Sequence, residues 1–329
     1  MFEPTVQTPA PDATRRRVGL VMALGAGFFW GTTGPLSTAL YAEGAALTAV
    51  GFWRIALAAV ALALWGVLRR ELFAVDLRGL LVVGLLGGAC VAGFEVAYQF
   101  AIAGVGVAGA AALLYTAPVL VAVAARLVLG EALTPLRLVL ALIVMVGATL
   151  TVRGGAGVEA LFASREQGMM LGVAGGLTAA VSYAGTTLIG RWAVPRYGAL
   201  RVLWLEIAGG TVLLAVILPL VDQAPALPAG LGAWIYVGLL AAGTVVAANI
   251  LFFGALRRIE AAPVSVAATI EPVAGALLAL VLLGQTLTVF GWLGLVLVVA
   301  AVATGYMVEG ARPGGRRPAP PLDPRTAGR

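Results

Sequence analysis

The stretch APVLVAVAARLVLGEALT, residues 117–134, returns in altered form as EPVAGALLALVLLGQTLT, residues 271–288. The two copies share a proline, a Leu-Gly pair and a Leu-Thr pair, with residue 117 matching residue 271, an offset of 154 positions. The same offset aligns VGLL at 83–86 with VGLL at 237–240. Agreement at two separate places indicates that the chain consists of two related halves.

The composition indicates a membrane protein. The 329 residues are 61% hydrophobic and 11% charged, and the mean hydropathy is +1.02, whereas soluble domains carry about 25% charged residues. A membrane-spanning helix needs about 20 mostly apolar residues. Such runs cover residues 18–39, 46–68, 79–102, 106–127, 134–152, 168–190, 200–220, 231–255, 261–283 and 287–308.

These runs predict helices, because barrel strands alternate polar and apolar residues over about ten positions. The predicted fold is an all-α integral membrane protein with ten transmembrane helices. The first run is too long for a signal peptide and lacks a small-residue cleavage site, so we interpret it as a retained helix. The expected parts are a tail (1–17), a five-helix repeat (18–152), a linker (153–167), a second five-helix repeat (168–308) and a second tail (309–329).

Five helices is an odd number, so the second copy is expected to cross the membrane in the opposite direction to the first. Inverted repeats recur in secondary transporters, where the binding site lies between the two halves. The arginines support one orientation. With the N-terminus inside, only Arg153 and Arg165 among the loop and tail arginines lie outside, which is the positive-inside pattern. A bacterial inner membrane with both termini in the cytoplasm is the prediction.

Several classes of function are disfavoured. The chain has no histidine and one cysteine, Cys90, so we expect no metal site, no disulfide and no cofactor. The net charge of +6 is explained by the arginines at the cytoplasmic side, so nucleic acid is not an expected partner. GVGVAG at 104–109 fits GxGxxG, but it follows no predicted strand, and we interpret it as a turn between two helices.

The sequence also resembles a known family. The residues that carry the resemblance are FFWGTTGP at 28–35, FWRIALAAVAL at 52–62 and the two copies around LGEALT and LGQTLT. They are similar to the EamA branch of the drug/metabolite transporter superfamily, over essentially all of 18–308. The resemblance implies a ten-helix exporter, such as the YddG-type aromatic amino-acid exporters or the threonine/homoserine exporters. Gln285 departs from the Glu frequent in the second-half motif, whereas the first half keeps Glu131.

Charged residues within a lipid bilayer are costly and mark function or a buried pair. Arg54 lies deep in the second run and matches an arginine frequent in the EamA family; a structural role and a role in substrate binding both remain open. Glu95 shares a helix face with Tyr98 and Gln99. Its counterpart at the offset of 154 is Asn249, so both halves keep a polar residue at this position.

Glu271 stands directly before Pro272, where proline removes a backbone donor and loosens the helix. Pro118 is the equivalent in the first half. A static kink and a moving hinge remain open at both prolines. Glu206, near the inner end of its run, is expected to reach the interface or to pair with Arg201.

Aromatic residues deep in the runs complete the candidate site. Trp30, Tyr115 and Tyr183 are expected to line a cavity for an aromatic or amphipathic solute, although lipid-facing or packing roles fit each one alone. The full set of expected substrate-binding residues is Trp30, Thr33, Arg54, Glu95, Tyr98, Gln99, Tyr115, Tyr183, Asn249 and Glu271, with hinges at Pro118 and Pro272.

The sequence therefore predicts an alternating-access exporter of small amphipathic metabolites, with amino acids, aromatic ones above all, as the preferred substrates. The alternatives are a multidrug or cationic-compound exporter, a membrane-embedded enzyme and a scaffold. The lack of histidine disfavours the enzyme, and the inverted duplication disfavours the scaffold. Proton coupling is open. The expected partners are a small-molecule substrate and the bilayer, in a monomer or, through small-residue faces such as GLLGGA at 84–89, a homodimer.

Overall fold

The computed structural model describes residues 13–68, 74–153, 166–283 and 288–311, and all regular secondary structure in them is helical. The first half contains α1 (Ala13–Gly31), α2 (Thr33–Ala42), α3 (Leu47–Leu68), α4 (Leu77–Gly79), the π-helix η2 (Leu80–Gly87), α5 (Gly88–Leu114), α6 (Ala117–Leu129) and α7 (Pro135–Arg153). The second half contains α8 (Glu166–Tyr197), α9 (Ala199–Leu220), α10 (Gly230–Leu239), the π-helix η4 (Leu240–Ala247), α11 (Ala248–Leu256), α12 (Ala261–Ala268), α13 (Glu271–Leu283) and α14 (Val289–Ala311).

Five helical runs in these described ranges are long and apolar enough to cross a membrane: Thr48–Val67, Leu77–Tyr98, Met170–Tyr197, Ala199–Leu220 and Gly230–Leu256. Three shorter apolar helices accompany them, Ala117–Leu129, Pro135–Leu150 and Val289–Gly305. Three of the ten expected runs contain a helix break: 18–39 between α1 and α2, 106–127 between α5 and α6, and 261–283 between α12 and α13. A broken run does not contain one long helix, so the helices of the structure do not reproduce the ten expected runs one for one.

One expected turn has helical backbone. Residues 103–105, predicted as a turn between the third and fourth runs, lie inside α5 together with the GVGVAG stretch. No proline occurs between Gly88 and Leu114, and the alanines of this segment favour the helix. The glycines alone therefore do not end the helix.

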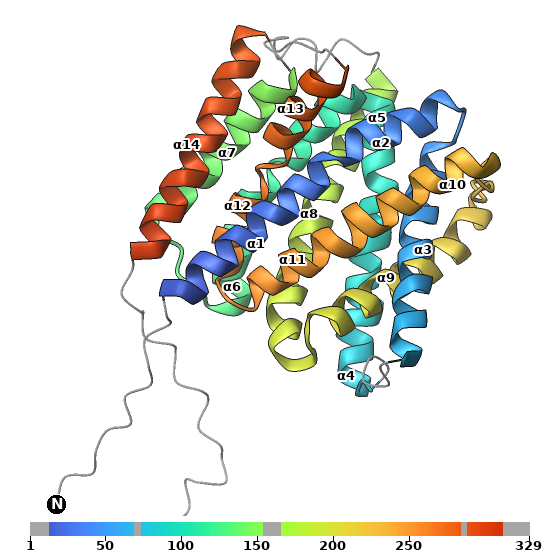
Figure 1. Cartoon of the computed structure of the whole chain (residues 1–329), viewed down its shortest axis with the longest axis horizontal. Helices are drawn as coiled ribbons and strands as arrows, with labels where there is room; N and C mark the ends of the chain where they lie inside the picture. Colours follow the sequence, from blue (N-terminus) through green and yellow to red (C-terminus); the bar gives the residue numbers. More distant parts are fainter. Residues whose placement is uncertain (1–12, 69–73, 154–165, 284–287, 312–329) are drawn as a thin grey trace, which may run out of the picture.

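The duplication is visible in the pattern of helix breaks. α5 ends before Tyr115 and α6 begins at Ala117, and α12 and α13 are separated at the equivalent positions, 269–270. α7 and α14 are also equivalent by the offset, and they pack along each other (Figure 1). Leu140 lies near Gly305, whereas Gly147 lies against Gly294, so the two equivalent helices run antiparallel.

Small residues set the closest helix contacts. A Cβ atom on Gly209 of α9 would lie 1.9 Å from the backbone oxygen of Gly84, and one on Gly88 would lie 2.7 Å from the carbonyl carbon of Gly209. Such contacts let two helix backbones approach each other. The GLLGGA stretch at 84–89 therefore packs against another helix of the same chain. This is one of its two expected roles, the other being a contact in a homodimer.

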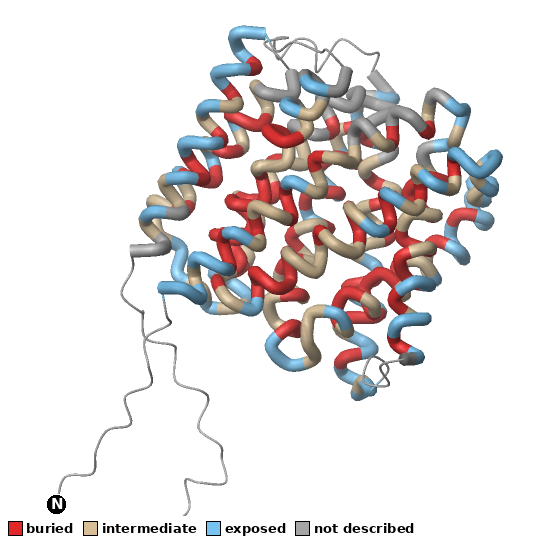
Figure 2. The backbone as a smooth tube through the Cα atoms, viewed as in Figure 1, coloured by how far each residue is buried: buried red, intermediate tan, exposed pale blue. Residues whose placement is uncertain are grey.

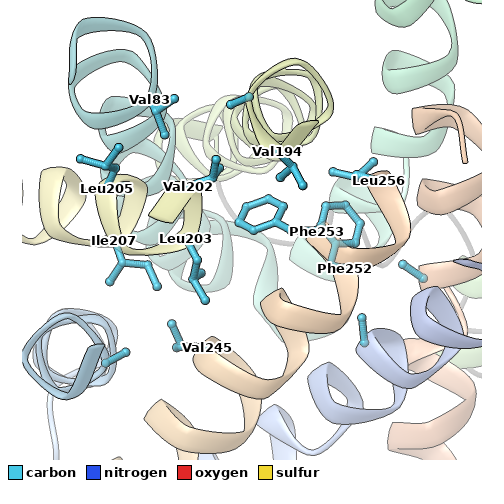
Figure 3. Packing of buried hydrophobic residues seen from close by; sticks show 14 of the residues in the cluster. Val83, Val194, Val202, Leu203, Leu205, Ile207, Val245, Phe252, Phe253 and Leu256 are labelled. Atoms are coloured by element: carbon cyan, nitrogen blue, oxygen red, sulfur yellow. The ribbon is translucent and has the colours of Figure 1, made fainter. Parts of the chain in front are cut away.

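The buried residues run through the middle of the bundle, and exposed residues lie at its periphery (Figure 2). The largest buried cluster joins both halves: Val83 of η2 and Ile207 of α9 belong to it, as do Val194 of α8 and Phe253 of α11 (Figure 3). Lipid is as apolar as leucine, so van der Waals packing holds such a cluster together in a membrane. This shared core positions the helices that carry the candidate site.

Candidate functional site

An ion pair joins α3 to α5 inside the bundle. The Nη2 atom of Arg54 lies 2.6 Å from Oε1 of Glu95, and the two side chains are 16% and 7% exposed. Oε2 of Glu95 and Nε of Arg54 are buried and have no hydrogen-bond partner. Buried polar atoms are normally paired, so this ion pair leaves one acceptor and one donor free. The sequence predicted both residues as candidates, and the structure adds that they contact each other.

Two tyrosines lie beside this pair. Tyr41 of α2 and Tyr98 of α5 are both within electrostatic range of the Arg54 guanidinium. The Tyr98 ring is stacked on Phe94, with the ring centroids 5.6 Å apart and an interplanar angle of 7°. The sequence did not predict Tyr41, because the first run was expected to end at residue 39. The break at Thr32 separates α2 from α1, and α2 carries Tyr41 next to Arg54.

A second carboxyl group lies at the helix break of the other half. Glu271 is the first residue of α13, and Tyr98, Tyr115 and Tyr183 all lie within electrostatic range of its carboxyl. The Arg54 guanidinium also lies within this range. Among the described residues, no basic side chain forms a salt bridge with Glu271. Glu271 as a residue is partly exposed.

The breaks have a common local chemistry. Pro118 and Pro272 are the second residues of α6 and α13, a position where the missing backbone donor costs no intrahelical hydrogen bond. A threonine precedes each of three helix starts and donates to a carbonyl of the preceding turn. The distances are 2.7 Å for Thr32 to Phe29, 2.7 Å for Thr116 to Leu113 and 2.9 Å for Thr269 to Ser265. Both prolines therefore lie at the start of a new helix. A hinge motion at these positions stays a prediction.

An aromatic cluster packs α1, α8 and α11 together. Trp30 lies 6.0 Å from Tyr183 and 5.2 Å from Phe252, and Tyr183 lies 5.9 Å from Phe252, as centroid distances. The indole Nε1 of Trp30 donates to the carbonyl of Thr244 at 3.0 Å. Trp30 therefore has a clear packing role, whereas Tyr183 belongs both to this cluster and to the group around Glu271.

Three predicted site residues contribute less to this picture. The amide of Asn249 donates to the Val245 carbonyl of its own helical turn at 2.7 Å. Thr33 is the first residue of α2 and is partly exposed. The side chain of Gln99 lies outside the described part of the chain. A role for these three in substrate binding stays a prediction.

Two side chains donate to carbonyls of the π-helix η4. A π-helix pairs residues i and i+5 where an α-helix pairs i and i+4. Side chains of Trp30 and Asn249 donate to two consecutive carbonyls, those of Thr244 and Val245. The Trp30 bond joins α1 to η4, whereas the Asn249 bond lies within its own helical turn.

One of the two expected roles of Glu206, reaching the interface, is contradicted by the structure. The residue is 2% exposed, so it does not reach the interface. A Cβ atom on Gly87 would lie 2.8 Å from Cγ of Glu206, which places this side chain in the contact between α9 and η2. Its distance along the helix axis suggested an interfacial position, but the direction of the side chain is set by the close packing against glycine.

Comparison with known proteins decides the family. The EamA-like transporter family matches the chain twice, over residues 17–153 and 170–306. The chain belongs to this family. Together with the five long apolar helices, membership of the EamA-like transporter family identifies a membrane-embedded, multi-pass protein with a general role in transport. The two matches also confirm that the chain carries the family domain in two copies.

Individual relatives agree with this assignment. The chain is 29% identical over 296 residues to "Uncharacterized transporter YwfM" of Bacillus subtilis (strain 168), a match that covers 88% of the chain and 92% of the relative. A solved structure described as "Crystal structure of protein" has a TM-score of 0.70 at 18% identity, and the match covers 88% of the chain and 98% of that structure. This second likeness concerns the fold.

Proposed function

We propose that this EamA-family protein exports small amphipathic metabolites by alternating access, with amino acids, aromatic ones above all, as its substrates. The observation that carries the proposal is the meeting of Arg54, Glu95 and Glu271 with tyrosines at a helix break between the halves. Charged groups inside a membrane protein mark a pathway or a binding site. Tyr98 comes from the first half and Tyr183 from the second, so a ligand between them contacts both halves.

The groups of the site suit an amino acid. Glu271 has no basic partner among the described residues and is placed to receive an ammonium group. Arg54 has a buried Nε without a partner. This N–H is available to donate to a substrate carboxylate, which would compete with Glu95 for the guanidinium. Tyr98, Tyr115 and Tyr183 lie within electrostatic range of the Glu271 carboxyl, and their rings would offer faces and edges to an aromatic side chain.

The proposed membrane topology has ten crossings in two inverted repeats, with both termini in the cytoplasm of a bacterium. The antiparallel packing of the equivalent helices α7 and α14 supports the inversion. Figure 1 shows the beginning of α1 and the end of α14 at the same end of the bundle. Arg15 of α1 donates to the carbonyl of Arg257 at this end, where arginines of both halves gather.

The test is uptake of labelled tryptophan or phenylalanine into proteoliposomes, with empty liposomes as the control and with or without an imposed pH gradient. Saturable uptake that unlabelled amino acids block is the expected result. Glu271→Gln should reduce uptake at least tenfold, because it removes the charge that would hold the ammonium group. Glu43→Gln, an exposed residue after α2, is the matched control and should leave uptake unchanged. Absence of uptake by folded protein refutes the aromatic amino-acid assignment.

One observation favours a second candidate, a cationic-compound exporter. Arg54 is already balanced by Glu95 at 2.6 Å, so Glu271 adds a carboxyl without a second cation near it among the described residues. Such a site with aromatic walls attracts organic cations. A competition panel with labelled phenylalanine and a labelled organic cation separates the two functions. Excess unlabelled tetraphenylphosphonium should block cation uptake by a cation exporter. Excess unlabelled phenylalanine at pH 7 should block phenylalanine uptake by an amino-acid exporter.

A further inference from the structure

Two ion pairs connect the halves at the end of the bundle where α1 begins. Arg191 of α8 contacts Glu131 in the turn between α6 and α7, with Nε 2.9 Å from Oε1. Arg137 of α7 contacts Glu260, the residue before α12. Arg137 and Glu131 are 7% and 9% exposed as side chains. Both pairs join a residue of the first half to a residue of the second.

Glu131 also holds the beginning of α12. Its two carboxylate oxygens accept from the backbone N–H of Ala261, at 3.2 and 3.0 Å. A carboxylate at a helix N-terminus satisfies a donor that has no intrahelical partner and interacts favourably with the helix dipole. On the other side of the same carboxylate, Arg191 is fixed by a second bond, from Nη1 to the Leu256 carbonyl at 2.5 Å. The α6–α7 turn of one half therefore caps a helix of the other.

α12 connects these pairs to the candidate site. The helix contains eight residues, all of them buried, and a helix of this length spans about 12 Å. α12 begins at Ala261, whose backbone N–H donates to the Glu131 carboxylate. The helix ends at the break that precedes Glu271. A displacement of α12 that rearranges the break at 269–270 must pull Ala261 away from Glu131 or move the α6–α7 turn with it.

The positions of the chain that correspond to these four residues carry none of their charges. Through the offset of 154, Glu131 corresponds to Gln285 and Arg137 to Gly291. Arg191 corresponds to Ser37 and Glu260 to Gly106. All four corresponding residues are uncharged, so the sequence does not provide the same ion pairs at the opposite end.

We propose that Glu131, Arg137, Arg191 and Glu260 form an ionic latch that holds the protein closed at this end and must open before the site is exposed there. The inference rests on the proposed alternating-access transport. It assigns these four residues to the gate at the end of the bundle where α1 begins. Each pair has one well-buried partner, Arg137 or Glu131, and separating the pairs leaves that charge without its counter-charge, so the latch favours the state closed at this end.

The test measures access to Ser265 of α12, which is fully buried, by a water-soluble methanethiosulfonate reagent. A Ser265→Cys variant is made in a Cys90→Ala background and reconstituted into nanodiscs. Removing both arginines, with Arg137→Ala and Arg191→Ala, should raise the labelling rate roughly tenfold or more, as expected for the loss of charged hydrogen bonds. Arg126→Ala removes an exposed arginine near the end of α6 and should leave the rate unchanged.

A second reporter separates gate opening from unfolding. Ser37→Cys lies on α2 and is 8% exposed. Opening of the latch should raise labelling at residue 265 without raising it at residue 37, whereas general unfolding raises both. An unchanged rate at residue 265 in the double-arginine variant, or an equal rise at both positions, overturns the latch. Labelling needs no substrate, so it decides the latch even when the uptake assay refutes the proposed function.

Discussion

The buried pair of Arg54 and Glu95 offers a prediction with a calculable size. Glu95→Gln keeps the shape of the side chain but leaves the Arg54 guanidinium, 16% exposed, without its counter-charge. Removing one partner of a buried ion pair costs about 3 to 5 kcal/mol. Glu271 lies within electrostatic range of Arg54 and compensates in part, so we expect the lower limit, about 3 kcal/mol, which is roughly a hundredfold in the unfolding equilibrium.

The single cysteine of the chain provides the assay. Cys90 is half-buried between α5 and α8, where a Cβ atom on Gly185 would lie 2.6 Å from its Sγ. A thiol-reactive fluorophore added during heating in detergent therefore labels Cys90 when these two helices separate. The Glu95→Gln protein should be labelled at a temperature several degrees below that of the wild type. The double variant Arg54→Met with Glu95→Leu buries no charge, so it should be labelled at a higher temperature than the single variant.

The order of the three proteins decides the reasoning. Wild type and Glu95→Gln with the same labelling temperature, or a double variant less stable than the single one, would show that Glu95 does not neutralise Arg54 in the folded protein. Glu43→Gln serves as the control, because Glu43 is exposed and its replacement removes the same charge outside the bundle.

Two further predictions concern packing and pH. Gly209→Ala places a methyl group 1.9 Å from the Gly84 oxygen and should destabilise the protein by about 1 to 3 kcal/mol, measured by the same thermal labelling, whereas Gly238→Ala, which meets nothing within 4 Å, should not. Hydrogen bonds from the Tyr197 hydroxyl and a backbone N–H hold the pKa of Asp76 below its usual range. This contribution to stability is present above the unfolded-state pKa and is lost as pH falls through the lower folded-state pKa. Asp76→Asn should therefore lower the labelling temperature at pH 7 and have a smaller effect near pH 3; an equal effect at both pH values contradicts the assignment.

The sequence predicted the features that have a local chemical cause. The prolines at 118 and 272, predicted to disturb their helices, lie in the first turns of α6 and α13, where a ring without an N–H costs no intrahelical hydrogen bond. The repeated segments reveal the duplication that the two family matches confirm. Charged residues in apolar runs likewise indicated Arg54 and Glu271, since nothing but a partner or a ligand makes such residues tolerable in a bilayer.

Features set by packing between distant segments were not predictable. The direction of α2 after Thr32 places Tyr41 beside Arg54, and no periodicity shows this. The π-helices leave no clear hydrophobic signature, so the use of Asn249 as a donor to its own backbone was invisible. Glu206 was misplaced because the sequence gives its height along a helix but not the glycine contact that encloses it.

The Glu131–Ala261 contact tolerates substitution unequally at its two ends. The acceptor is a side chain, but the donor is a main-chain N–H that every residue except proline supplies. A substitution of Ala261 other than proline keeps this donor, although the buried position leaves little room for a larger side chain, whereas replacement of Glu131 by an apolar residue removes the acceptor. The corresponding position in the other copy holds Gln285, an uncharged amide, so the two halves differ in the acceptor that they offer at this turn.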